Sequence, residues 1–383
     1  MSVDWLASAL DEKLGVRPTI GESGPIIEAS HGYMAQIKRV QLQWPIERDD
    51  LPKTVVLKFP AAGSAADAWV EAGGGDMAAE EKAKAAAEAA ENMNKVQAIM
   101  HTAESQVYAL FDENYPAPCP MPKTYASFGM DHDHPAIVME DITGATITDI
   151  VDGWTEKQLS TLIDSLVGLH VMSFTTEKWK SFDVDLVGNT MDDYTNMTNA
   201  FATEILKRNP LPCLEKVQKN MLINGDWFKR MYEKYKKHPL SVLVHGDMWA
   251  PQFLWRGDTV AAIVDWQLTH VGSIMEDFLH LLSLGVSPSI RTRLTPALLQ
   301  YYYTQLTSKL AEKGIKAPFS FEEMMDEYKF ALPHAAGTAI FAVAMWSNSP
   351  VLKTGASTDE ARIAEIFSRL TSILEECVEA YGW

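Results

Sequence analysis

The first third of the chain alternates short apolar runs with turn-forming residues, a pattern that predicts β-strands. Two of these runs would form a hairpin around His31-Gly32, and TVVLKF is a compact apolar strand. A proline at every second position of residues 116–122 excludes a helix there. The predicted strands lie at residues 25–30, 33–42, 54–59, 123–128 and 136–140.

Residues 61–94 interrupt this pattern with a segment rich in Ala, Gly and Glu. The segment has few residues that could build a core, and it favours a helix after Asp76. We expect a flexible or helical insertion that continues into a helix ending near Phe111.

Apolar residues recur at helical spacing beyond the last predicted strand. Helices are predicted at residues 155–174, at about 190–206 and 213–236, and again toward the C-terminus. They are interrupted once, where the short β runs SVLV and VAAIV frame a polar loop. We therefore predict an α+β protein, with a small β-rich lobe at residues 1–140 and a larger helical lobe at residues 141–383.

The composition narrows the classes of partner. The 383 residues carry a formal net charge of -18, which repels nucleic-acid phosphates and anionic lipid headgroups, so neither a nucleic acid nor a membrane is an expected partner. Cys119, Cys213 and Cys377 are odd in number and far apart, as in proteins with reduced thiols. No signal peptide is predicted at the N-terminus, and a cytoplasmic protein is expected.

Two aspartates at the ends of predicted strands are the main candidates for catalysis. Asp247 follows SVLV within His245-Gly246-Asp247, and Asp265 comes directly after the run VAAIV. Transfer of a γ-phosphoryl group from ATP needs one carboxylate near the acceptor hydroxyl and another on the Mg²⁺ that bridges the phosphates. Either aspartate alone could be a turn or cap residue, but the pair in this setting predicts a catalytic site.

Lys58 and Glu104 form a second candidate pair. A lysine inside the apolar strand VVLKF is costly unless its ammonium has a partner, which ATP phosphates and a carboxylate would supply. Glu104 lies on a helix whose apolar face includes Val107 and Leu110, so it could point inward to Lys58. The alternatives are an edge-strand lysine that reaches water and an ordinary exposed glutamate.

The segments VLVHGDMWAPQFLW and AAIVDWQLTHVGSIMEDFLHLL resemble the signature of the ecdysteroid-kinase-like, or CHK kinase-like, family, and most closely its nematode branch. That family is related to choline kinases and aminoglycoside phosphotransferases. The resemblance covers most of the chain. It implies a two-lobed protein-kinase-like fold, and an ATP-dependent kinase for a hydroxyl of a small molecule such as a steroid, a glycoside or a xenobiotic-like alcohol.

The resemblance implies a role for each catalytic candidate. Asp247 would orient the acceptor hydroxyl, and Asp265 would bind Mg²⁺. Lys58, held by Glu104, would contact the α- and β-phosphates of ATP.

The resemblance also implies roles for residues around these four. The backbone of Glu140, Asp141 and Ile142 would meet the adenine, and the hairpin Ser30, His31 and Gly32 would cover the phosphates. His245 and Asp277 would brace the catalytic loop without touching substrate.

Two positions depart from the family pattern. Gln252 stands where the family has an asparagine that binds a second Mg²⁺; its amide oxygen is still a suitable ligand, but the side chain is longer. The hairpin has one glycine instead of a Gly-x-Gly-x-x-Gly loop. A nucleotide-binding pseudokinase or scaffold, with catalysis weakened by Gln252, is therefore the alternative function. A protein kinase is disfavoured, because no segment after Asp265 resembles an activation loop.

Overall fold

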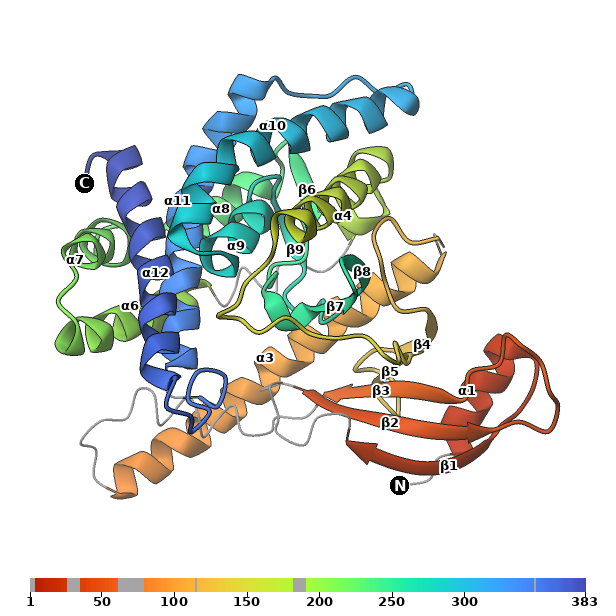
Figure 1. Ribbon diagram of the computed structural model, residues 1–383. Coiled ribbons are helices and arrows are strands. Elements are labelled where there is room, and N and C mark those ends of the chain that lie inside the picture. The colour runs from red at the N-terminus through yellow and green to blue at the C-terminus, as the bar shows by residue number, and fades with distance from the viewer. Residues whose placement is uncertain (1–3, 26–34, 61–78, 114–115, 182–190, 348) are drawn as a thin grey trace. The chain divides into compact units, whose positions relative to one another are not determined.

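The computed structural model describes the chain except residues 1–3, 26–34, 61–78, 114–115, 182–190 and 348 (Figure 1). The chain divides into two compact units, a first unit of residues 1–145 and a second unit of residues 146–383. The first unit contains a five-stranded sheet and the second is mainly helical, as expected for an α+β protein. Within the described ranges, no helix is both long and apolar enough to cross a membrane.

The first unit is built on an antiparallel sheet in the order β1-β2-β3-β5-β4. Helix α1 (Asp4–Leu14) precedes the sheet, and helix α3 (Ala79–Glu113) connects β3 to β4. The strands are β1 (Thr19–Pro25), β2 (Ala35–Gln43), β3 (Thr54–Pro60), β4 (Thr124–Phe128) and β5 (Ala136–Glu140).

Most of strand β1 is not among the strands predicted from the sequence. The predicted residues 25–30 lie outside the described residues apart from Pro25, and β1 begins at Thr19. Its sequence TIGESGP has no alternation of apolar and polar residues. The strand forms because it pairs with β2, in a register that runs from Thr19 opposite Gln43 to Pro25 opposite Lys38.

The core of the first unit lies on the sheet face that α1 covers. Successive side chains of a strand point to opposite faces, so Val55 and Leu57 of β3 face this core together with Val40 of β2. Leu6 and Leu10 of α1 pack against them. Helix α3 contacts β3, β4 and β5, and it is continuous through the part of the predicted insertion that the structure describes.

The second unit is a set of helices with two small β-ladders, β6 with β9 and β7 with β8 (Figure 1). The strands are β6 (Ser241–Val244), β7 (Phe253–Arg256), β8 (Thr259–Ile263) and β9 (His270–Ser273). The α-helices are α4 (Glu156–Thr175), α6 (Met191–Arg208), α7 (Pro212–Val217), α8 (Trp227–Tyr235), α9 (Glu276–Gly285), α10 (Pro288–Glu312), α11 (Phe321–Trp346) and α12 (Asp359–Tyr381). The shorter helical turns are η1 (Lys178–Ser181), η2 (Gln218–Ile223) and η3 (Ala250–Gln252).

The single helix predicted at residues 213–236 is wrong. Helix α7 passes into the π-helical turn η2, and the chain breaks before α8 begins at Trp227. Gly225 lies in the break, and a β-carbon there would come within 2.9 Å of the carbonyl oxygens of Asn220 and Met221. This close approach of the backbone to the preceding turn ends the helix.

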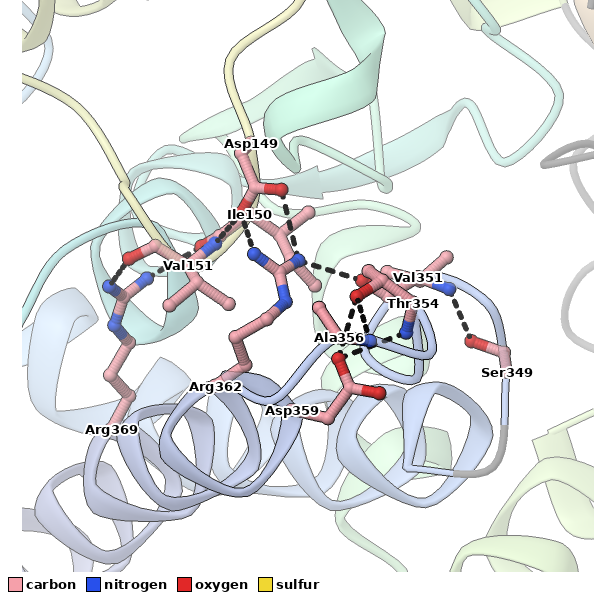
Figure 2. A network of polar contacts seen from close by, with 10 residues as sticks. All are labelled: Asp149, Ile150, Val151, Ser349, Val351, Thr354, Ala356, Asp359, Arg362 and Arg369. Atoms are coloured by element: carbon pink, nitrogen blue, oxygen red, sulfur yellow. Dashed lines mark hydrogen bonds and ion pairs between the residues drawn. The ribbon is translucent and has the colours of Figure 1, made fainter.

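Arg369 of α12 is a buried anchor for two segments of the second unit, of which Figure 2 shows the one at residues 150–151. Its side chain, 2% exposed, donates hydrogen bonds of 2.8 Å to the carbonyl oxygens of Ile150 and Leu284, and another to that of Val151. These carbonyls belong to irregular backbone and to the end of α9, where no helical or sheet partner is available. The guanidinium therefore supplies hydrogen bonds that the secondary structure cannot.

Arg362, also on α12, binds Asp149, the residue that precedes Ile150 and Val151 (Figure 2). Its two terminal nitrogens lie 3.1 and 2.9 Å from the carboxylate oxygens of Asp149, and one of them also donates to the Val351 carbonyl at 3.0 Å. This paired geometry holds the pKa of Asp149 below its usual value against the opposing effect of burial.

We expect Arg369→Leu to lower the free energy of unfolding by about 3–5 kcal/mol, because it leaves buried carbonyl groups without donors. Urea denaturation measures the change. Arg293→Gln is the matched control, since Arg293 is 58% exposed and pairs with Glu156 at the surface. Its cost should stay below about 1 kcal/mol. Equal losses in the two variants would contradict the anchoring role of Arg369.

Candidate active site

A buried ion pair joins β3 to α3 in the first unit. The ammonium nitrogen of Lys58 lies 2.8 and 2.7 Å from the two carboxylate oxygens of Glu104. Both residues are buried, with exposed fractions of 5% and 1%. Lys58 follows the core residue Leu57, so the strand period turns it to the opposite face, toward α3. The pairing predicted from the sequence is present.

His101 adds a neutral polar group near this ion pair. Its Nε2 lies 2.8 Å from the carbonyl oxygen of Phe128 on β4. Burial lowers the pKa of His101, and the positive charge of Lys58 lowers it further against the effect of that hydrogen bond. At neutral pH the charges of this region are therefore those of Lys58 and Glu104.

The segment that follows β5 is attached to the sheet by the side chain of Asp141. The carboxylate of Asp141 accepts hydrogen bonds from Arg39 at 2.6 and 3.0 Å and from the Thr54 hydroxyl at 2.7 Å. Burial opposes ionisation of Asp141, but these donors outweigh it and hold its pKa below the usual value. The backbone N–H of Glu140 donates to the Lys123 carbonyl at 2.8 Å.

The predicted nucleotide site also includes the backbone of Ile142 and the hairpin at residues 30–32. Among the described residues, the backbone N–H of Ile142 has no hydrogen-bond partner, which leaves it able to donate to a ligand. Ser30, His31 and Gly32 lie outside the described residues, so their predicted role is neither supported nor opposed.

In the second unit, the loop after β6 is fixed by one buried carboxylate. Asp277, fully buried on α9, accepts the backbone N–H of His245 at 2.7 Å and that of Gly246 at 2.9 Å. The His245 ring links onward, because its Nε2 lies 3.0 Å from the Val264 carbonyl and its Nδ1 lies 3.2 Å from the Asp247 amide nitrogen. His245 and Asp277 thus hold the loop and do not project as reactive groups.

The ionisation of Asp277 is finely balanced. Burial, and then the nearby charge of Glu276, raise its pKa to about 7, while the backbone N–H groups of His245 and Gly246 lower it. Both carboxylate oxygens act as acceptors, an arrangement that favours the ionised form.

Asp265 has a backbone conformation that few residues adopt. Its φ is +68°, and it is the one non-glycine residue with positive φ among those described. Aspartate tolerates this region better than most residues, and such strain persists where the surroundings enforce it, often at functional sites. Here the next residue, Trp266, is fully buried, and the preceding Val264 donates its N–H to the Gln252 carbonyl at 2.9 Å.

Gln252 joins the two candidate catalytic carboxylates. Its side chain is 6% exposed, and its Nε2 donates to Asp247 at 3.0 Å and to Asp265 at 3.1 Å. The structure therefore brings together all three residues that the sequence singled out. No cluster of three or more His, Cys, Asp or Glu side chains suited to a metal occurs in the described ranges. A cation here would depend on the two carboxylates and the amide oxygen, which are hard donors.

Two aromatic residues of this region, Trp249 and Tyr194, are not among the candidates that the sequence indicates. Trp249, two residues after Asp247, stacks on Trp346 of α11 with ring centroids 4.9 Å apart. Tyr194 of α6 packs on Phe341 at 4.9 Å. Burial raises the pKa of Tyr194, and the negative charges of Asp247 and Glu276 raise it further. No local sequence signal marks Tyr194, because its role depends on the packing of α6 against α11.

Sequence comparisons identify relatives with two kinds of name. A family model described as "Uncharacterized oxidoreductase dhs-27" matches residues 3–382. The protein of that name from Caenorhabditis elegans is 28% identical over 210 residues, which are 51% of this chain and 25% of that protein. The "Uncharacterized kinase-like protein D1044.1" from C. elegans is 25% identical over 273 residues, 67% of this chain and 70% of that protein. The chain thus spans about a quarter of the first relative.

Structural comparisons identify the fold. The chain is similar to choline kinase from Cryptosporidium parvum Iowa II, with a TM-score of 0.53, 10% identity, and coverage of 100% of this chain and 99% of that one. It is also similar to a putative aminoglycoside phosphotransferase from Ralstonia eutropha JMP134, with a TM-score of 0.50, 13% identity, and coverage of 99% and 98%. The predicted protein-kinase-like fold is confirmed, as is the resemblance to kinase-like families.

We expect Gln252→Glu to be destabilising, because it places a third carboxylate about 3 Å from those of Asp247 and Asp265. The repulsion would raise the pKa of the new carboxyl group. The cost, about 2–4 kcal/mol, would be present above that raised pKa and relieved as the group takes up a proton toward pH 5. Urea denaturation at pH 8 and pH 5.5 measures it.

The control for this substitution is Gln300→Glu, the same change at an exposed position of α10. It should alter the free energy of unfolding by less than about 0.5 kcal/mol at both pH values. A Gln252→Glu variant whose stability relative to wild type is independent of pH would show that the amide does not lie between two ionised carboxylates.

Proposed function

The chain belongs to the family whose model, described as "Uncharacterized oxidoreductase dhs-27", matches residues 3–382, and we propose that it is an ATP-dependent phosphotransferase that phosphorylates a hydroxyl group of a small molecule. The observation that carries this proposal is the meeting of Asp247 and Asp265 on the buried amide of Gln252. Phosphoryl transfer is catalysed mainly by positioning and by charge, and it needs two carboxylates with different tasks held on rigid supports. Asp247 lies shortly after the end of β6, which pairs with β9, and Asp265 lies shortly after the end of β8, which pairs with β7. A hydrogen bond from the His245 ring to the Val264 carbonyl joins the two strand ends.

Asp247 would orient the acceptor hydroxyl and accept its proton. As the acceptor oxygen bonds to the γ-phosphorus, the bond from that phosphorus to the β–γ bridging oxygen breaks and ADP leaves. Asp277 supports this step indirectly, because its two hydrogen bonds to the loop fix the backbone next to Asp247. A loop fixed in advance does not have to reorganise during the transfer.

Asp265 and Gln252 would hold Mg²⁺ through oxygen atoms, and the residues present fit such an ion. Gln252 would have to turn its amide, since its nitrogen now lies next to both carboxylates. The ion would neutralise charge on the phosphates. The strained backbone of Asp265 is consistent with a residue whose side chain must point in one direction for function.

The first unit would bind the nucleotide. Lys58, already oriented by Glu104, offers an ammonium group for the α- and β-phosphates. The backbone around Glu140, Asp141 and Ile142 would meet the adenine, and an Ile142 N–H to which no described residue is hydrogen-bonded supports this assignment. Ser30, His31 and Gly32 remain the proposed phosphate-covering hairpin.

The acceptor would be a steroid, a glycoside or a xenobiotic-like alcohol. The aromatic rings near Asp247, those of Tyr194 and Trp249, are suited to an acceptor with an apolar body. Phe341 and Trp346 of α11 pack behind these rings. They would shape the acceptor site without contacting the reacting atoms.

A nucleotide-binding pseudokinase is the second candidate. The observation in its favour is that the Gln252 amide donates to both carboxylates, a contact that competes with metal binding. An oxidoreductase is not proposed. The named oxidoreductase relative matches this chain over only 25% of its own length, and the fold found here is that of kinase-like phosphotransferases.

Mg²⁺-ATP should raise the melting temperature of the wild-type protein, because a ligand that binds only the native state stabilises it, by about 2.7 kcal/mol at a hundred times Kd. Lys58→Met combined with Glu104→Gln should abolish most of that shift, and the double change avoids a buried unpaired carboxylate. Lys13→Met, which breaks an ion pair with Asp112 elsewhere in the first unit, should keep the full shift. No shift in wild type at millimolar Mg²⁺-ATP would rule out both candidate functions.

Asp247→Asn and Asp265→Asn should have different effects. We expect Asp247→Asn to reduce turnover at least about a hundredfold with ATP binding nearly intact, because its carboxylate acts on the acceptor. Asp265→Asn should remove the Mg²⁺-dependent part of ATP binding, because it deletes a charged ligand. Phosphate transfer from labelled ATP to a panel of hydroxylated metabolites, together with thermal shifts, measures both. Wild-type behaviour of both variants would refute the assignments, and binding without turnover in wild type would support the pseudokinase.

A further inference from the structure

A buried ion pair that the proposed reaction does not use lies next to the loop that carries Asp247. His270 is the first residue of β9, and Glu276 is the first residue of α9. The His270 Nε2 is 2.8 Å from the Oε1 of Glu276, and the side chains are 15% and 3% exposed. His334 of α11 approaches the same oxygen at 3.6 Å.

The pair borders a small cavity of about 40 Å³ inside the second unit. A water molecule needs roughly 10–15 Å³ of such space, so the cavity has room for a few waters. Its wall includes Tyr194, whose pKa responds to the charges of both Asp247 and Glu276. The cavity therefore has room for water beside the buried pair.

His270 lies beside the catalytic loop. Its Nδ1 lies 2.8 Å from the Leu268 carbonyl oxygen. A β-carbon on Gly246 would overlap that oxygen and would come within 3.3 Å of the His270 ring. In the ladder of β6 and β9, His270 pairs with Val244, the last strand residue before the loop. The ring of His270 is thus part of the surface on which the backbone next to Asp247 rests.

We propose that the ion pair of His270 and Glu276 is a positioning device for the catalytic loop. The carboxylate of Glu276 holds the His270 ring against Gly246, and the ring in turn holds the loop that carries Asp247. Asp277, the next residue after Glu276, holds the same loop through its backbone N–H groups. Adjacent acids of α9 thus support one loop by two routes. The expected effect on turnover rests on the proposed phosphotransfer.

The pair is charged at neutral pH. Burial alone would lower the pKa of His270, but the carboxylate of Glu276 raises it to about 9. Burial raises the pKa of Glu276, but the two histidines beside it lower it to about 2. Because folding raises the pKa of His270 and lowers that of Glu276, the stabilisation by the pair is complete between about pH 4.5 and pH 6.5. It is lost as the pH rises through about 9, and again as the pH falls through about 2.

Other titratable groups that face the pair change protonation in other pH ranges. The pKa of Asp277 is raised to about 7 by burial and by Glu276, and burial lowers the pKa of His280 to about 3. Burial also lowers the pKa of His334 and raises that of Tyr194. The phenols of Tyr232 and Tyr235 complete the cavity wall. Among the groups with a stated shift, His270 is the one whose pKa is raised to about 9.

Glu276→Gln tests the proposal, because it keeps the shape of the side chain and removes its charge. We expect kcat at pH 7.5 to fall about ten- to a hundredfold, with KM for ATP within about twofold, since a displaced catalytic group affects the chemical step more than nucleotide binding. The alkaline limit of the pH–rate profile should move from about pH 9 to a lower pH, because His270 loses its proton more easily without the carboxylate.

A second measurement does not depend on activity. Trp249 lies on the catalytic loop and stacks on Trp346 with an interplanar angle of 22°, so the near-UV circular dichroism removed by Trp249→Phe reports the position of the loop. We expect this signal to be reduced in Glu276→Gln at pH 7.5, and to decline in wild type between pH 8 and pH 10. Glu327→Gln is the matched control: it removes a buried carboxylate that pairs with Lys234 at 2.9 Å, and it should change neither readout.

The outcomes separate this proposal from the proposed function. If Glu276→Gln leaves both the Trp249 signal and the alkaline limit unchanged, the pair does not position the loop, whatever the activity of wild type. If the Trp249 signal responds as expected but wild type transfers no phosphate to any acceptor, the loop-holding role stands and the proposed phosphotransfer is refuted. A Glu327→Gln variant that shifts both readouts equally would reduce the effect of Glu276→Gln to general destabilisation.

Discussion

The carboxylate of Asp277 has to find partners inside the protein, because no part of the side chain reaches water. It finds them in the backbone N–H groups of His245 and Gly246, and this requirement determines the path of the loop. Gly246 then adopts a φ of +82°, with its α-carbon so close to the Leu268 carbonyl that no β-carbon fits. The hydrogen bonds of Asp277 and the conformation of Gly246 together determine the position of Asp247, the next residue of the loop.

The same network reaches the second carboxylate. The His245 ring joins the loop to the Val264 carbonyl, and the next residue is Asp265. Gln252 closes the connection by donating to Asp247 and to Asp265. A single buried carboxylate is thus linked through short hydrogen bonds to both candidate catalytic groups, so the loop and the strand end are held together as one unit.

Buried charge also organises the first unit, where Lys58 has Glu104 as its partner. The sequence allowed this pair to be predicted because two local patterns are sufficient for it. The alternation of VVLKF turns Lys58 away from the core that includes Leu57, and the helical spacing of Val107 and Leu110 turns Glu104 toward the sheet. Neither pattern specifies distance, but an unpaired buried ion costs enough to make the pairing the favoured solution.

The sequence by itself determined the strands β2 to β5, the long helix α3, and the placement of Asp247 and Asp265 directly after apolar strands, because those features follow from the period of a few neighbouring residues. Only the tertiary structure decided the start of β1, the place of the Gln252 amide between two carboxylates, and the ion pair of His270 with Glu276. Each of these depends on a partner supplied by another element, and each shows no periodicity of its own. A local pattern records which face of an element is apolar, whereas the partner of a polar group is set by the packing of that face against the rest of the chain.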